Sequence, residues 1–174
     1  MGSRIKTNCS GFPPVSGPDA EILILGSIPS IASMEKREYY GHQRNAFWWI
    51  MGEILGFDCG VMNYSLRKLQ LLRNGIALWD VLNRCERPGS LDSAIISETI
   101  IPNDFTSFFA EHANIKHIYF NGTKAEQEYG RRVKPELPAK FAEISCRRLP
   151  STSPAMASLS KSAKLAQWRQ IISR

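Results

Sequence analysis

The chain has 174 residues, a formal net charge of +6 and 43% hydrophobic residues, which fits one globular domain. No run of about 18 apolar residues is present, so no membrane-spanning segment is expected. The N-terminus lacks the apolar stretch of a secretory signal. Residues 1–10 are therefore predicted to be a polar, disordered lead-in, and residues 11–174 a single domain.

Short apolar runs alternate with helical patterns along the chain. The predicted strands are 21–27, 76–81, 116–122 and 141–149, and the predicted helices are 46–57, 64–73, 99–113, 123–131 and 161–172. This alternation is typical of a parallel sheet covered by helices on both faces. Ligands of such sheets bind at the loops that follow the carboxyl ends of the strands.

The loop after the first strand reads Gly26-Ser27-Ile28-Pro29-Ser30. Glycine permits a tight turn and close approach of a ligand, proline stiffens the loop, and both serines can donate to a phosphate or a base. An ordinary turn has the same composition.

Residues 39–49 combine two tyrosines, a histidine, an arginine, an asparagine and three further aromatic residues. An aromatic face can stack on an unpaired base, and Asn45 can hold a water or read a base edge. The alternative is that Phe47, Trp48 and Trp49 are core residues at the start of a helix.

Two later loops also carry polar side chains. Asp80 directly follows a buried strand, where it serves either as a helix cap or as a ligand. Residues 149–155 place three hydroxyl groups between two prolines, which makes a rigid turn suited to phosphate or simply a capped helix entrance.

The last part of the chain is basic: ten Lys or Arg and two Glu lie between Arg131 and Arg174. A basic end favours a polyanionic partner, although many basic faces are only solvated. The four cysteines are scattered without a C-x-x-C pair, as is typical of reduced thiols in a cytoplasmic protein. A zinc or iron–sulfur site assembled from distant cysteines is the alternative.

The segments GSIPS, HQRNAFW and LPSTSPA, in this order, resemble the uracil-DNA glycosylase superfamily over about residues 11–172. The resemblance implies a three-layer α/β/α fold with a central four-stranded parallel sheet and no required cofactor. It also implies a monofunctional DNA glycosylase, which flips a damaged base out of DNA and hydrolyses its N-glycosidic bond during base-excision repair.

One departure is informative. Other branches carry a water-activating Asp or Asn at position 28, where this chain has Ile28. The pattern is similar to the hypoxanthine-DNA glycosylase branch, and that resemblance moves the catalytic role to Asn45. The resemblance places Asp80 at the position that reads the base. An ionised carboxylate there would accept a hydrogen bond from the N1–H of hypoxanthine, whereas N1 of adenine carries no hydrogen and is only an acceptor.

This interpretation gives each candidate residue a role. The catalytic residue is Asn45, and the base-binding residues are Phe47, Asp80, Ser27 and Ile28. The DNA-binding residues are Gly26, Pro29, Ser30, His42, Arg44, Pro150, Ser151, Thr152, Ser153, Arg147, Arg148 and Lys161. The expected partner is DNA with a deaminated base, bound by a monomer in a bacterial or archaeal cytoplasm, with no metal.

Three alternatives remain open from the residues. The excised base can be uracil or a mismatched thymine. The chain can be a nucleic-acid-binding module without activity, because Ile28 cannot polarise water. Finally, Ser27 can be a hydrolase nucleophile with His42 as its base.

Overall fold

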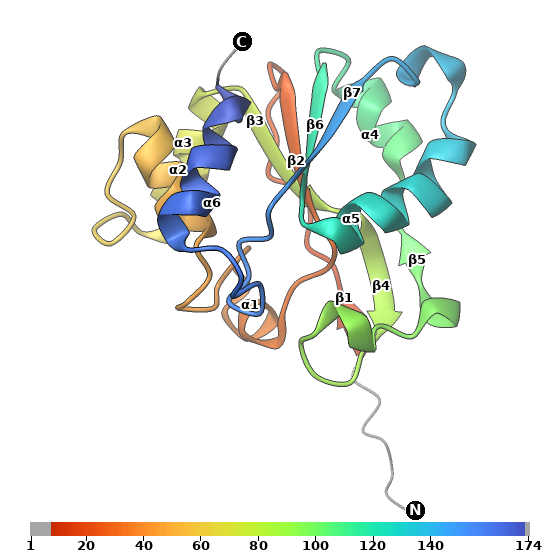
Figure 1. Ribbon diagram of the computed structural model, residues 1–174. Coiled ribbons are helices and arrows are strands. Elements are labelled where there is room, and N and C mark those ends of the chain that lie inside the picture. The colour runs from red at the N-terminus through yellow and green to blue at the C-terminus, as the bar shows by residue number, and fades with distance from the viewer. Residues whose placement is uncertain (1–7, 173–174) are drawn as a thin grey trace, which may run out of the picture.

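A four-stranded parallel sheet forms the centre of the computed structural model, which describes residues 8–172 (Figure 1). The strand order is β3-β2-β6-β7, with bounds Ile76–Asp80, Ile22–Gly26, His117–Asn121 and Ser145–Leu149. All residues of β2 and β3 are buried, because continuous apolar runs can cover both faces of an inner parallel strand. The three-layer fold expected from the sequence is confirmed.

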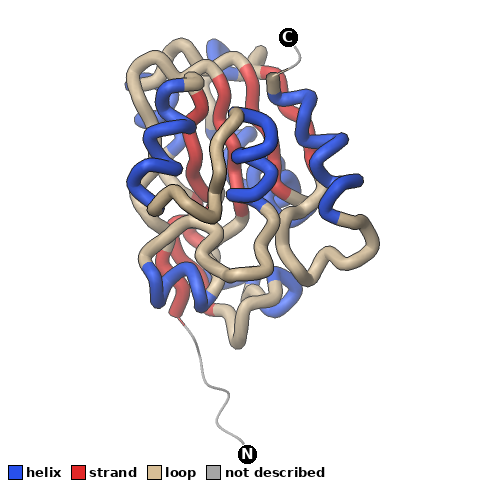
Figure 2. The backbone as a smooth tube through the Cα atoms, turned by 90° about the vertical axis from the view of Figure 1, so that its left-hand side faces the viewer, coloured by secondary structure: helices blue, strands red, loops and turns tan. Residues whose placement is uncertain are grey.

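Helices cover both faces of this sheet. One face carries α2 (Phe47–Leu55), α3 (Tyr64–Arg73) and α6 (Lys161–Trp168), and the other carries α4 (Phe105–Glu111) and α5 (Thr123–Glu128). In Figure 2 the helices of the first face lie in front of the strands. Short turns complete the chain: η1 (Asp92–Ala94), η2 (Ser97–Thr99), the π-helical η3 (Tyr129–Val133), η4 (Lys134–Glu136), η5 (Ala139–Phe141) and η6 (Arg169–Ile171).

A second, antiparallel sheet was not predicted. It contains β1 (Asn8–Ser10), β4 (Leu82–Glu86) and β5 (Ile101–Pro102), with β4 in the middle. The predicted lead-in is therefore wrong for Asn8–Ser10, which is held because Cys9 is buried opposite Cys85. Residues 1–7 of that lead-in lie outside the described residues.

Two helix predictions need correction. The helix expected over 99–113 begins only at Phe105, because Asp104 caps it by accepting from the Ser107 N–H, and the residues before it form η2 and β5. A short helix, α1 (Ile31–Lys36), was missed; the side chain of Ser30 caps it. Helix α3 has the predicted bounds.

The topology determines where a ligand can bind. The carboxyl ends of the four parallel strands meet at the lower edge of the sheet in Figure 1, close to α1 and the small sheet. Within residues 8–172, no helix is long and apolar enough to cross a membrane.

Candidate active site

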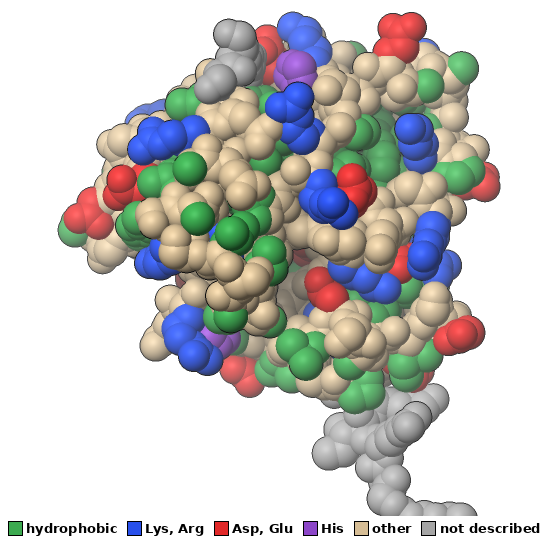
Figure 3. Space-filling model, in the orientation of Figure 1, with side chains coloured by type: hydrophobic (Ala, Val, Ile, Leu, Met, Phe, Trp, Pro, Cys, Tyr) green, Lys and Arg blue, Asp and Glu red, His purple; other side chains and the backbone are tan. Residues whose placement is uncertain are grey.

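A cavity of about 370 Å³ lies at the carboxyl ends of the strands. Its walls come from the loops after β2 and β7, the ends of β3 and β6, the segment that begins at Tyr39, and residues 87–93. Figure 3 shows the surface hollowed in the lower half of the molecule. Six separate parts of the chain therefore meet around one ligand-sized space.

The cavity gathers most of the predicted site. It is lined by Gly26, Ser27, Ile28, Pro29, Ser30, Asn45, Asp80, Ser151, Thr152 and Ser153. Seven predicted residues lie outside its lining: Phe47, His42, Arg44, Pro150, Arg147, Arg148 and Lys161. Sequence reasoning missed Tyr40, Arg87, Asp92 and Asn121, which also line it.

Phe47 is a core residue, so its predicted role in base stacking is wrong. Its side chain is 0% exposed and packs edge-on against Trp168 at 5.9 Å. Its outer face is covered by the ring of Tyr40, with centroids 4.1 Å apart and planes 26° apart. The aromatic ring that lines the cavity is therefore that of Tyr40.

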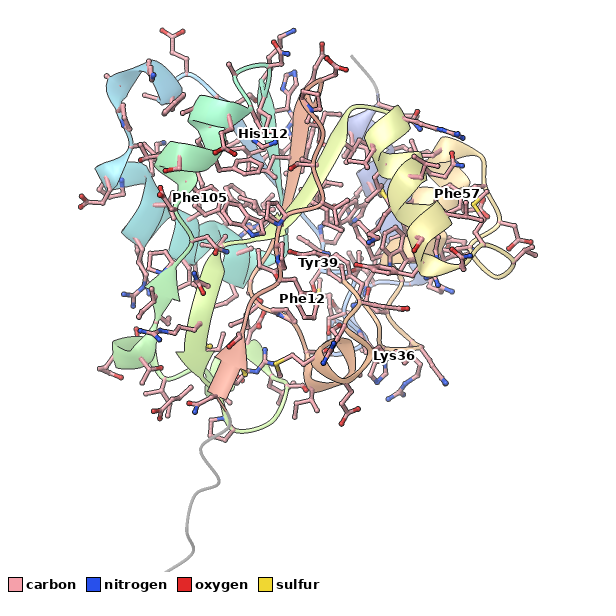
Figure 4. The ribbon with its side chains drawn as sticks, turned by 180° about the vertical axis from the view of Figure 1, so that it is seen from behind. Phe12, Lys36, Tyr39, Phe57, Phe105 and His112 are labelled. Carbon is pink, nitrogen blue, oxygen red and sulfur yellow. The ribbon has the colours of Figure 1, made fainter. Side chains whose placement is uncertain are left out.

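Tyr40 is held rigidly. Its backbone has the positive φ of 55°, a conformation uncommon outside glycine. The neighbouring Tyr39 anchors the segment, since its hydroxyl donates to the carbonyl oxygens of Phe12 and Pro13. Figure 4 shows Tyr39 and Phe12 close to each other below the sheet. Strain of this kind is typical of functional sites.

Asp80 Oδ2 is buried at the cavity without a hydrogen bond from residues 8–172. The Tyr40 hydroxyl is buried beside it and interacts with the side chain of Asn121. A Cβ at Gly26 would collide with Asp80 Oδ1 and lie 2.9 Å from the Tyr40 oxygen. Only glycine therefore allows these two groups to converge at the end of β2.

The Asp80 carboxyl is mostly protonated at neutral pH. Burial raises its pKa to about 8, repulsion from Asp92 adds to this effect, and Arg87 opposes it. The sequence had suggested an ionised carboxylate at this position. A protonated carboxyl instead offers one donor and one acceptor side by side.

Asn45 faces the cavity but has a second task. Its Oδ1 accepts from the backbone N–H of Phe47 at 3.0 Å, which stabilises the start of α2. The adjacent Ala46 N–H donates to the Thr152 carbonyl. Thr152 is in turn held by two hydrogen bonds to Asn121. The Asn121 side chain donates to the Thr152 hydroxyl and accepts from the Thr152 N–H. The loops after β6 and β7 thus hold Asn45 in place.

Two other predicted groups have local partners. Ile28 is 7% exposed and contributes only an apolar wall. Ser27 donates from its hydroxyl to Asp92 Oδ1 at 2.8 Å. This bond brings a carboxylate to the cavity from a segment that the sequence did not single out.

The predicted cationic contacts lie at the periphery. Arg148 pairs with Glu126 at 3.0 Å, Arg147 donates to Gln170, and the Lys161 ammonium lies 4.7 Å over the Trp49 ring. Figure 3 shows basic and acidic side chains interspersed on this face. Contacts of these cations with DNA stay predictions.

The remaining titratable groups offer no evident metal site. Among residues 8–172, no three His, Cys, Asp or Glu side chains are grouped to hold an ion. Activity without a cofactor stays a prediction.

A polar cavity beyond the carboxyl ends of a parallel sheet, with a strained aromatic residue and a buried carboxyl, is typical of an α/β enzyme that binds a small ligand. The model of the "Uracil DNA glycosylase superfamily" matches residues 13–173. The chain therefore belongs to this superfamily.

Three relatives support the assignment. The "Hypoxanthine DNA glycosylase" of Methanosarcina acetivorans is 38% identical over 161 residues, 92% of this chain and 96% of its own length. The protein of that name from Methanosarcina barkeri is 44% identical over 115 residues, 66% and 72% of the two chains. A candidate uracil DNA glycosylase from Methanosarcina acetivorans, solved by solution NMR, has a TM-score of 0.78 at 35% identity and covers 95% of this chain and 96% of its own.

Proposed function

We propose that this DNA glycosylase releases hypoxanthine from deoxyinosine in DNA. The observation that carries the proposal is Asp80 Oδ2, a buried polar atom on the cavity floor that has no hydrogen bond from residues 8–172. A buried polar group is costly unless a ligand completes its hydrogen bonds. The names of the two similar archaeal glycosylases support the same substrate.

A protonated Asp80 suits the edge of hypoxanthine. Its carbonyl oxygen accepts from the base N1–H while its O–H donates to the base O6, so both atoms of the carboxyl gain partners. The base must leave the helix to reach this floor, as in other enzymes that act on nucleobases. Tyr40 then provides the face on which the flipped base stacks.

Hydroxyl groups at the mouth of the cavity suit the flanking phosphates. Ser151 and Ser153 use their oxygens to accept from nearby backbone N–H groups, and this leaves their hydroxyl protons available to a phosphate. Ser30 is occupied at the cap of α1. We therefore expect Ser151 and Ser153 to contribute more to DNA binding than Ser30.

Uracil is the second candidate, because it offers the same pair of an N–H donor and a neighbouring carbonyl. A panel of oligonucleotides, single-stranded and double-stranded, each with one deoxyinosine, deoxyuridine or mismatched thymine, tests both proposals. The amount of abasic product is measured against time. We expect hypoxanthine to be released fastest. Faster release of uracil overturns the choice of base. If no lesion gives an abasic product, the chain is a DNA-binding module without glycosylase activity.

Truncation of Tyr40 is expected to weaken base binding. Stacking of a base on an aromatic ring contributes about 1–3 kcal/mol, so Tyr40→Ala should weaken the affinity for lesion DNA about 5- to 150-fold. Tyr40→Phe, which keeps the ring, is the matched variant and should bind within a few-fold of wild type. Equal losses in both variants would show that the hydroxyl, and not the ring, makes the contact.

The excision rate is expected to depend on the Asp80 proton. As the pH rises through about 8, Asp80 loses its donor and the wild-type rate should fall. Asp80→Asn keeps one donor and one acceptor at every pH, so its rate should stay level across that range. Asp80→Leu removes both and should be inactive. Parallel pH profiles for wild type and Asp80→Asn would contradict this role.

Two further expectations remain part of the proposal. We expect a monomer that acts on DNA in the cytoplasm. Light scattering on the eluting protein, with and without DNA, measures the oligomeric state directly.

A further inference from the structure

We propose that Asp92 is a catalytic residue of this glycosylase: its carboxylate takes the proton of the water that replaces the base on the sugar. The proposal rests on the proposed function and adds a residue from a loop outside the predicted motifs. Four observations lead to it.

The first observation is that none of the residues predicted to contact the water or the nucleobase can act as a proton acceptor. Ile28 presents only apolar atoms to the cavity. Asn45 has one lone pair of Oδ1 engaged with the Phe47 N–H, and an amide oxygen can orient a water but does not take its proton at neutral pH. Asp80 is mostly protonated at pH 7. None of these three groups accepts the proton.

The second observation is the place of Asp92. Its Oδ1 lies 2.8 Å from the hydroxyl of Ser27, the residue directly before Ile28. The side chain lines the same cavity as Asn45 and is exposed, whereas Asp80 is buried on the floor. The carboxylate therefore lies beside the residue that precedes Ile28, in the lining of the cavity.

The third observation is that the supporting loop is fixed. Arg87, which is 1% exposed, donates to the Pro29 carbonyl at 2.6 Å and to the Gly89 carbonyl at 2.9 Å. Ser90 accepts from the Ile31 N–H at 3.1 Å. These bonds fasten residues 87–92 onto the loop after β2. A catalytic group needs such a rigid support to stay within reach of the reacting atoms.

The fourth observation is the charge around the carboxylate. Burial among the cavity walls has the largest effect on Asp92 and raises the pKa of its carboxyl above the usual value. The Ser27 hydroxyl, Arg87 directly after β4 and Lys124 on α5 act against this rise and favour the ionised form. Asp80 and the Tyr40 hydroxyl also face it, but both are mostly neutral at pH 7. An ionised carboxylate with a raised pKa is a better proton acceptor.

The step balances as a hydrolysis. The C1′–N9 bond breaks and its electron pair leaves with the purine, so the sugar gains oxocarbenium character. A lone pair of the water forms the new C1′–O bond. One water proton passes to Asp92 and is then returned through solvent to the purine, which departs as neutral hypoxanthine. The ionised carboxylate also stabilises the positive sugar before the water attacks.

The test compares single-turnover excision rates on duplex DNA that contains one deoxyinosine. Asp92→Asn keeps an acceptor for the Ser27 hydroxyl but cannot take a proton. We expect its rate to fall by roughly 10²-fold, its affinity for lesion DNA to change less than about threefold, and the acidic limb of the pH–rate profile to disappear. Asp58→Asn, at an exposed aspartate in a distant turn, is the matched control and should keep the wild-type rate.

Ser27→Ala separates catalysis from positioning. If Asp92 only holds the loop through Ser27, Asp92→Asn, which keeps the acceptor for the Ser27 hydroxyl, loses no more activity than Ser27→Ala, and the proposal is overturned. If Asp92 is catalytic, Ser27→Ala loses clearly less than Asp92→Asn. A rate of Asp92→Asn within threefold of wild type also overturns the proposal.

Failure of the proposed substrate gives a different result. Wild-type protein that releases uracil and not hypoxanthine refutes the substrate, and the same comparison of Asp92→Asn with Asp58→Asn is then made on deoxyuridine DNA. A loss confined to Asp92→Asn on that substrate supports the role of Asp92.

Discussion

Replacement of Asn45 with alanine is expected to lower the single-turnover excision rate by about 10²–10³-fold. Asn45 lines the cavity, and its Oδ1, which accepts from the Phe47 N–H, has a second lone pair that can accept one proton of the attacking water. Alanine removes this acceptor. It also removes the hydrogen bond to the Phe47 N–H at the start of α2, which costs about 0.5–1.5 kcal/mol of stability, so rates are compared well below the melting temperature.

Asn45→Asp separates the two tasks of this residue. Aspartate still accepts from the Phe47 N–H, and its charge is favourable at a helix N-terminus. It also introduces a base beside the water, so its rate should lie well above that of Asn45→Ala. The catalytic assignment fails if Asn45→Ala excises at the wild-type rate, or if both variants lose activity only in proportion to their loss of stability.

The sheet was predictable because its inner strands carry a strong local signal. Every residue of β2 and β3 is buried, so each strand appears in the sequence as a nearly continuous run of apolar residues. The small sheet gives a much weaker signal: β4 mixes buried and exposed residues, β5 has two residues, and β1 lies in a polar stretch. In this sheet β1 pairs with β4 across more than 70 residues, and no local pattern reports such pairing.

The same reasoning explains which site residues were found. Polar groups directly after buried strands were accessible to sequence analysis, and Asp80 was identified in this way. Asn121 is the last residue of β6, a partly buried strand, and was overlooked although it lies at the same edge of the sheet. Asp92 meets Ser27 across 65 positions of the chain, from an irregular segment with no recognisable period. Only the folded structure brings that carboxylate to the cavity.

The choice between Phe47 and Tyr40 shows a different limit. The sequence indicated a cluster of aromatic rings but not which ring faces the cavity. That is decided by packing, because Phe47 is the first residue of α2 and turns towards Trp168 of α6. Tyr40 lies in the preceding loop and covers the outer face of the Phe47 ring.

Phe47→Ala is therefore expected to act on stability before it acts on chemistry. Removal of a fully buried phenylalanine costs about 3–5 kcal/mol, a large share of the roughly 5–15 kcal/mol that stabilises a typical domain. Urea titration followed by circular dichroism measures this loss. Phe57→Ala, at a ring that only partly packs on the core, is the matched control and should lose less.

Activity then distinguishes the two possible roles of Phe47. If it supports Tyr40 from within the core, Phe47→Leu should restore most of the stability together with most of the excision rate, because leucine refills much of the space behind the Tyr40 ring. If Phe47 instead contacts the base, Phe47→Ala would remain as stable as wild type while its affinity for lesion DNA falls. Since the Phe47 ring is closed off from the cavity by Tyr40, we expect stability and activity to be lost and recovered together.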